Sequence, residues 1–189
     1  MLSLSTPDTN THSYRLSKRR FHLEKNEILF AKLADDVIIP TKRDEDAGFD
    51  IYAHFEEENM VFAPHETKMV PTGLVSAFDK SYVMILKERG STGTKGIGQR
   101  CGVVDSGFRG ELFVPITNHN DKPAVITKDT SDSAVDALSD DYIVYPYTKA
   151  ICQAIILPVP AVHTKEVSVE EIMAIDSERG TGSVGSSGK

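Results

Sequence analysis

The chain has 189 residues, with 21 basic and 28 acidic side chains and a formal net charge of -7. A domain of this length buries roughly two-thirds of the surface that its unfolded chain exposes, so it needs no disulfide bonds. The acidic excess argues against nucleic acid as a partner. Apolar runs are too short for a membrane span, and the polar residues 1–10 do not resemble a secretory signal.

Residues 1–27 are polar and of mixed charge, and we expect them to form an N-terminal extension. From Ile28 onward, short apolar runs alternate with Gly- and Pro-containing turns, which predicts an all-β fold of the jelly-roll type. The expected strands are 28–33, 48–53, 60–63, 67–71, 74–77, 82–87, 101–104, 111–117, 124–127, 142–145 and 150–157.

Helical periodicity is weak along the chain. A short helical turn is expected within 91–99, and one short helix over 168–174, opened by Ser168 as N-cap. The Asp- and Ser-rich segment 128–141 is expected to be a strandless surface insertion. The predicted organisation is therefore a β domain over 28–177 followed by a Gly-rich C-terminal arm over 178–189.

The two cysteines, Cys101 and Cys152, lie in apolar or Gly-flanked runs without C-x-x-C spacing. We expect both to be free, buried thiols rather than a disulfide or a metal site. Free thiols indicate the cytoplasm or another reducing intracellular compartment.

The first segment with chemistry of its own is 47–53, AGFDIYA. Gly48 allows close approach to the backbone, and Asp50 places a carboxylate in an otherwise apolar strand. On an alternating strand Asp50 shares a face with Gly48 and Tyr52. The alternative is an Asp that is solvated or caps a turn.

The second segment, 88–96, follows a hydrophobic strand. Its hydroxyls and exposed amides are framed by Arg89 and Lys95, and such a loop can hold phosphate oxygens. It does not match the P-loop pattern, because Gly96 follows Lys95. A solvated turn is the alternative.

The third segment, 102–112, contains Asp105 and Phe108 beside a tight turn, which predicts a hairpin between the flanking strands. The backbone at the mouth of a hairpin can read a base edge, and an aromatic ring can lie against a sugar or base. Alternatively, residues 105–107 are merely a turn.

The fourth segment, 151–156, has a single amide, Gln153, in a strand of buried type. A buried amide needs partners, either within the protein or on a ligand. The last segment, 179–189, has an arginine, serines and repeated glycines, and its alternatives are an anion-binding flap or a disordered tail.

Taken in order, these segments resemble the ordered motifs of the trimeric dUTP diphosphatases (dUTPases). The resemblance covers roughly residues 28–188. It implies a homotrimer of distorted jelly-roll (β-clip) subunits with shared active sites, and a C-terminal arm that closes over a neighbour's site. It also implies hydrolysis of dUTP to dUMP and pyrophosphate with Mg2+, which removes dUTP from the nucleotide pool and supplies dUMP.

The resemblance also implies roles for individual residues. Asp105 would activate the attacking water as the catalytic residue, and Phe108 would stack on the deoxyribose and exclude a 2′-hydroxyl. Asp50 would support the metal indirectly, through water. The remaining implied substrate-binding residues are Arg89, Gly90, Ser91, Thr92, Gly102, Val104, Gln153, Arg179, Val184, Gly185 and Ser186.

The sequence departs from the family pattern in several places. Phe108 stands where the family usually has Tyr, Gly90 separates Arg89 from Ser91, and Val184 stands where the arm usually has an aromatic residue. The segment 128–147 is longer than usual between the third and fourth motifs, and could contact a protein partner.

Two other functions compete with this interpretation. A dCTP deaminase has a related fold and a similar Asp-x-Gly-aromatic turn, but Pro115 stands where its catalytic Glu is expected. A dUTPase-like scaffold could instead serve mainly as a nucleotide-gated protein-binding module, acting through 128–147 or the basic residues 18–20.

Overall fold

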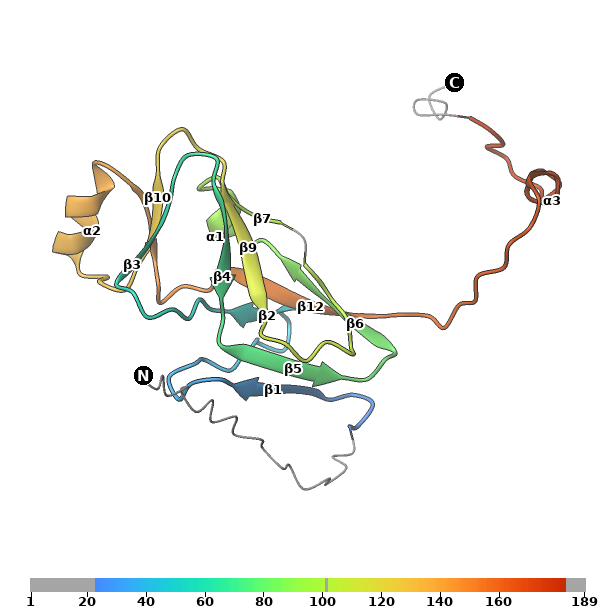
Figure 1. The fold of residues 1–189 in the computed structure, drawn as a ribbon, viewed down its shortest axis with the longest axis horizontal. Coiled ribbons are helices and arrows are strands. Elements are labelled where there is room, and N and C mark those ends of the chain that lie inside the picture. The colour runs from blue at the N-terminus through green and yellow to red at the C-terminus, as the bar shows by residue number, and fades with distance from the viewer. Residues whose placement is uncertain (1–22, 101, 183–189) are drawn as a thin grey trace, which may run out of the picture. The chain divides into compact units, whose positions relative to one another are not determined.

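The computed structural model describes residues 23–100 and 102–182 and consists mainly of short β-strands (Figure 1). The predicted mostly-β fold is confirmed. The chain forms two compact units, Met1–Val159 and Pro160–Lys189. Among the described residues, none of the helices has the length and apolar character needed to span a bilayer.

The strands of the first unit form four small sheets. All strand pairs are antiparallel except β10 with β11. In spatial order the sheets are β1 (Ile28–Lys32) and β5 (Leu74–Phe78); β11 (Ile143–Pro146), β10 (Ala124–Thr127) and β3 (Asn59–Phe62); β2 (Gly48–Ile51), β12 (Cys152–Pro158), β6 (Tyr82–Lys87) and β8 (Val103–Val104); and β4 (Thr67–Pro71), β9 (Phe113–Asn118) and β7 (Ile97–Gln99).

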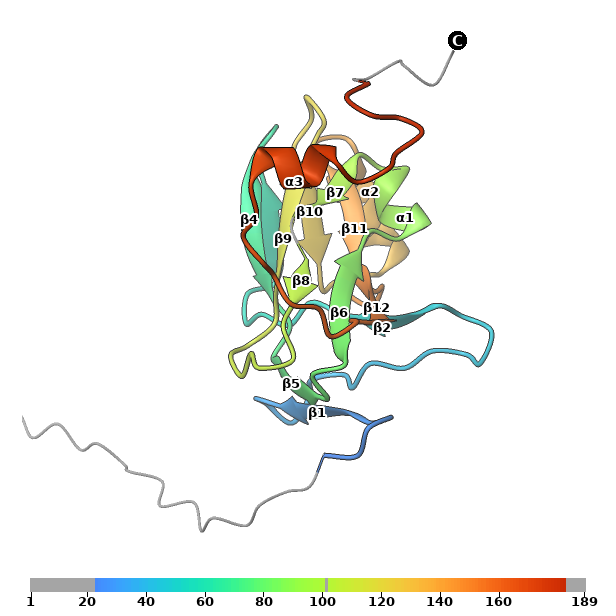
Figure 2. The same ribbon diagram turned by 90° about the vertical axis from the view of Figure 1, so that its right-hand side faces the viewer.

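The core lies between these sheets and is built by strand alternation. On β5, for example, every second residue is buried, from Leu74 to Phe78. Ile51, Val70 and Met84, which come from different sheets, are each 0% exposed and belong to one continuous apolar cluster. In Figure 2, β1 and β5 lie side by side, and the connection between β1 and β2 extends beyond β2.

The predicted hairpin of 101–104 with 111–117 is wrong. β8 pairs with β6, whereas β9 pairs with β4 and β7, so the two strands belong to different sheets. Residues 105–112 therefore cross from one sheet to another. Local turn signals correctly located this crossing but could not identify the partner of either strand.

The structure has more helix than expected. α1 (Gly90–Gly93) lies where a helical turn was predicted, but α2 (Asp132–Ser139) occupies a segment that was expected to be a loop. The Ser131 hydroxyl caps α2 by accepting a hydrogen bond from the Ala134 N–H. Since β11 is a sheet strand within 128–147, only the first part of that segment lies outside the sheets.

The second unit contains α3 (Val169–Met173), close to the predicted helix. Ser168 and Glu171 form a capping box at its start, as the Ser168 N-cap predicted. Apolar side chains of this unit, including Val162, Ile172 and Ile175, are more than half exposed.

Candidate active site

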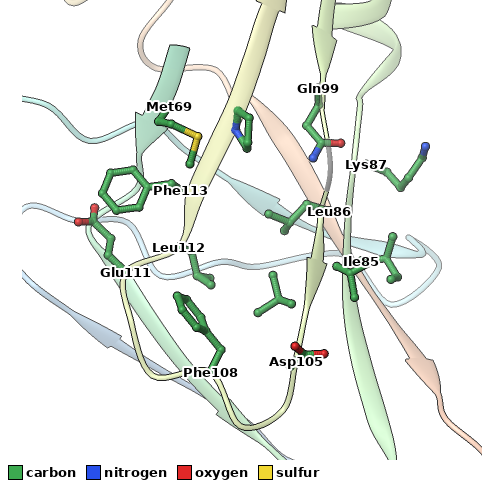
Figure 3. Close-up of a pocket in the computed structure, with 14 residues that line it drawn as sticks. Met69, Ile85, Leu86, Lys87, Gln99, Asp105, Phe108, Glu111, Leu112 and Phe113 are labelled. Carbon is green, nitrogen blue, oxygen red and sulfur yellow. The ribbon is translucent and has the colours of Figure 1, made fainter. Parts of the chain in front are cut away.

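Asp105 and Phe108 lie on one open cavity of about 620 Å³, here called the Phe108 cavity. Figure 3 shows both residues at one end of it, with Met69 and Gln99 at the other. The Phe108 side chain is 45% exposed, so one face of its ring is free to contact a ligand. Apart from Asp105, Lys87, Gln99 and Glu111, the lining is apolar or glycine: Met69, Ile85, Leu86, Gly102, Val103, Val104, Phe108, Leu112, Phe113 and Pro115.

Hydrogen bonds within the crossing segment fix the shape of the turn that carries Asp105. The Phe108 N–H donates to the Asp105 carbonyl at 3.0 Å. Arg109 Nη1 donates to the carbonyls of Ser106 and Phe108, each at 2.7 Å. The Asp105 carboxylate and the Phe108 ring are thus presented together by a braced turn.

Gly102 and Val104 support this cavity through the backbone. The Gly102 carbonyl accepts a hydrogen bond from the Leu86 N–H at 2.7 Å, and its φ is 146°. A Cβ at Gly102 would lie 2.5 Å from the Leu86 carbonyl oxygen, so a larger residue does not fit. Val104 is buried and pairs with Met84.

A second cavity, of about 650 Å³, is lined by Arg89, Asp50 and Gln153 together with part of the 41–48 connection. We call it the Arg89 cavity. Arg89 Nε lies 3.2 Å from Asp50 Oδ1, and each side chain is about one-third exposed. The sheet order explains this contact, because β12 lies between β2, which carries Asp50, and β6, which ends before Arg89.

Gln153 is held from two sides. Its Nε2 donates to the Glu88 carbonyl at 3.0 Å. A Cβ at Gly48 would lie 2.8 Å from Gln153 Oε1, so the close approach expected at Gly48 is made by this side chain. The internal hydrogen bond that the sequence left open is therefore present, while Gln153 still lines the cavity.

The segment 89–95 divides its hydroxyls between the interior and the surface. Thr92 is buried, and its Oγ1 donates to the Arg89 carbonyl at 2.9 Å, so this side chain braces the segment. Ser91 is exposed, and Gly90 has open space around the position of a Cβ. Gly90 therefore separates Arg89 from Ser91 without any steric requirement for glycine.

The Phe108 cavity and the Arg89 cavity have no lining residue in common. The predicted site residues of the first unit thus fall into two groups, one around Asp105 and one around Asp50. Arg179 lies in the second unit, where its Nε donates to the Gly182 carbonyl at 3.1 Å. Val184, Gly185 and Ser186 lie outside the described residues.

Charged residues that we did not predict also line the Arg89 cavity. Arg43 forms a two-pronged ion pair with Asp46, with both hydrogen bonds at 2.9 Å, and Lys42 lies nearby. The charged run at residues 42–46, directly before AGFD, was the signal in the sequence that could have indicated them.

Comparison with known proteins points to one family. Residues 35–132 match the dUTPase family model. The chain is 32% identical over 165 residues to a deoxyuridine 5'-triphosphate nucleotidohydrolase of Gloeobacter violaceus, covering 85% of this chain and 96% of that protein. A Neisseria meningitidis protein of the same name is 32% identical over 166 residues, covering 86% and 94%.

Solved structures share the fold. A Staphylococcus bacteriophage 80alpha dUTPase mutant with dUpNHpp has a TM-score of 0.66 and 24% identity, covering 87% of this chain and 99% of that chain. A mutant dUTPase from phage phi11 of S. aureus, described with a structural Mg(II) ion, has a TM-score of 0.58 and 20% identity, covering 75% and 97%.

Proposed function

The chain belongs to the dUTPase family, and on that basis we propose that it hydrolyses dUTP to dUMP and pyrophosphate. The observation that carries the proposal is the match to the Gloeobacter violaceus nucleotidohydrolase along nearly its whole length. The chemistry of the two cavities supports it, since one is apolar with an exposed ring and a carboxylate and the other is polar with an arginine.

In this proposal the nucleoside occupies the Phe108 cavity. The exposed ring of Phe108 lies against the deoxyribose, and backbone groups between Gly102 and Val104 face the uracil. Asp105 accepts a proton from the attacking water, which then forms the new bond to the α-phosphorus. A general base must lie within hydrogen-bonding reach of that water, and the exposed, braced position of Asp105 suits this role.

The phosphates are assigned to the residues of the Arg89 cavity. The guanidinium of Arg89 and the hydroxyl of Ser91 are suited to phosphate oxygens, and the charge that develops on the leaving pyrophosphate is stabilised by such donors. Gln153 lines the same cavity and is placed near the α-phosphate. Arg179 and residues 184–186 of the arm complete this end of the site.

We propose that the two groups of residues meet between subunits of a homotrimer. Within one chain they line separate cavities, so a site that needs both Asp105 and Arg89 is supplied most simply by different copies. Shared sites of this kind are what the resemblance to trimeric dUTPases implied.

Mg2+ is the expected cofactor. Among residues 23–100 and 102–182, no three His, Cys, Asp or Glu side chains gather in a way that could hold a metal ion. This fits Mg2+ that enters with the nucleotide, because Mg2+ commonly keeps several waters and binds substrate phosphates. Asp50 would support its water shell, and the bound ion would supply charge neutralisation at the phosphates.

Two further proposals concern partners and location. The insertion carries α2, whose Asp132 and Asp136 are exposed, and a protein partner could bind there. Cys152 is a free, buried thiol, and we place the protein in the cytoplasm or another reducing compartment. The deaminase alternative is disfavoured, since Pro115 is buried in β9 and has no proton to transfer.

The test is pyrophosphate release from dUTP, UTP, dCTP and dTTP with Mg2+, using the full chain. We expect dUTP to be hydrolysed preferentially and Asp105→Asn to lower turnover by roughly 10²–10⁴-fold. Asp121→Asn, at a fully exposed carboxylate, is the matched control and should retain activity. Ammonia release from dCTP would favour the deaminase, and a silent wild-type chain that still binds a partner would favour the binding module.

A further inference from the structure

Tyr145 on β11 is buried, with 2% of its surface exposed, and it was not among the predicted site residues. A buried hydroxyl requires a hydrogen-bond partner. The Tyr145 hydroxyl donates to the Ala150 carbonyl at 2.6 Å, across the turn between β11 and β12. The core residue Tyr145 thus places a polar group directly before the strand that carries Gln153.

The same carbonyl also accepts a hydrogen bond from Arg89. Its Nη1 lies 3.5 Å from the Ala150 oxygen, while its Nε pairs with Asp50. Burial raises the pKa of Tyr145, and the neighbouring Ser91 hydroxyl and Arg89 guanidinium oppose that rise. Both side chains therefore lie beside the Tyr145 oxygen.

The other end of the segment 89–95 is held against β11 as well. Lys95 Nζ donates to the Val144 carbonyl at 2.8 Å and lies 5.9 Å from the centre of the Tyr145 ring. A cation at this distance from an aromatic face is attracted to it. Tyr145 is accordingly in contact with the segment near both of its ends.

We propose that Tyr145 is a positioning residue, whose hydroxyl fixes Arg89 and Ser91 in the orientation in which they bind the nucleotide's phosphates. The inference rests on the proposed function, because that function assigns these two side chains to the phosphates. Tyr145 is buried and acts through them. Holding a long arginine side chain in place before the ligand arrives reduces the entropy lost on binding.

The test compares Tyr145→Phe with the wild-type chain by calorimetry. Phenylalanine keeps the ring that fills the core and removes only the hydroxyl. One probe is the α,β-imido analogue of dUTP with Mg2+, and the other is deoxyuridine, which has no phosphates. We expect Tyr145→Phe to weaken binding of the analogue roughly 5–10-fold, the usual size for one hydrogen bond, and to leave deoxyuridine binding unchanged.

Tyr147→Phe is the matched control. Tyr147 is a partly buried tyrosine whose ring packs edge-on against Phe55, away from Arg89. Removing its hydroxyl should not change the affinity for either probe. A double-mutant cycle with Ser91→Ala adds a second measurement, because a hydroxyl that acts through Ser91 gives losses that are not additive.

Several results would overturn the inference. These are equal affinity of Tyr145→Phe and the wild type for the analogue, an equal loss for both probes, or fully additive losses in the cycle. If the wild type hydrolyses dUTP but Tyr145→Phe binds normally, the inference alone fails. If the wild type binds the analogue in a Tyr145-dependent way without hydrolysing dUTP, the proposed function alone fails. If it does not bind the analogue, both fail.

Discussion

Asp50 and Arg89 form an ion pair across the end of β12, with 3.2 Å between Oδ1 and Nε. Each side chain is about one-third exposed, so solvent screens the pair and its contribution to stability is small. The same contact fixes the direction of the guanidinium in the Arg89 cavity. Its main value is therefore expected in orientation rather than in folding.

Asp50→Asn should consequently lower dUTP turnover by about 10-fold or more while costing no more than about 1 kcal/mol of unfolding free energy. Steady-state hydrolysis and urea denaturation measure the two effects. Asp46→Asn, which breaks the exposed ion pair with Arg43, is the control and should change turnover much less. A stability loss that matches the activity loss would contradict the orienting role.

Gly48→Ala should destabilise the chain and disturb Gln153. The new Cβ would lie 2.8 Å from Gln153 Oε1 and 3.0 Å from its Cβ, so the side chain must move. We expect a loss of roughly 1–3 kcal/mol, as for other overpacked sites, and a higher KM for dUTP. Gly90→Ala has open space and should preserve stability. If both variants unfold at the same denaturant concentration, the close packing at Gly48 has no energetic consequence.

Phe108→Ala should relax the discrimination between dUTP and UTP. The ring is 45% exposed, so most of its contact area is available to a ligand and little stability depends on it. The ratio of kcat/KM for the two nucleotides is the measurement, and we expect it to fall by about 10-fold. Leu157→Ala removes a comparably exposed apolar side chain outside both cavities, and its ratio should be unchanged. Unchanged selectivity in Phe108→Ala would exclude the stacking role.

Deletion of residues 178–189 should reduce turnover far more than stability. Residues 178–181 are exposed, so removing them uncovers little core. We expect a shift of less than about 4 °C in Tm, which corresponds to less than about 1 kcal/mol for a domain of this length. Arg179→Ala in the full chain separates the loss of one guanidinium from the loss of the arm. A large drop in Tm on truncation would show that the arm contributes to folding.

Cys152 should make stability depend on pH in the alkaline range. Burial raises the pKa of its thiol to about 12, whereas an unfolded cysteine titrates near about 8.5. Between these values the unfolded chain releases a proton that the folded chain retains, so the free energy of unfolding falls as pH rises. Denaturation of wild type and Cys152→Ala from pH 7 to 10 isolates this effect. Parallel curves for the two proteins would contradict it.

The sequence by itself determined the composition of the site and most of the strands. Alternating apolar residues and Gly/Pro turns are local signals, so they correctly predicted β5, β6 and β12, and Ser168 correctly marked the start of α3. The motif residues follow from the sequence alone, because their chemical types and their order are properties of the chain.

The tertiary structure decided which of these residues meet. Strand pairing depends on burial and backbone hydrogen bonds between distant segments, so turn signals could not show that β8 pairs with β6 instead of β9. For the same reason the sequence could not place Arg89 beside Asp50, turn Thr92 inward, or bring Tyr145 under the segment 89–95. Each of these contacts joins residues whose neighbours in sequence carry no record of the other.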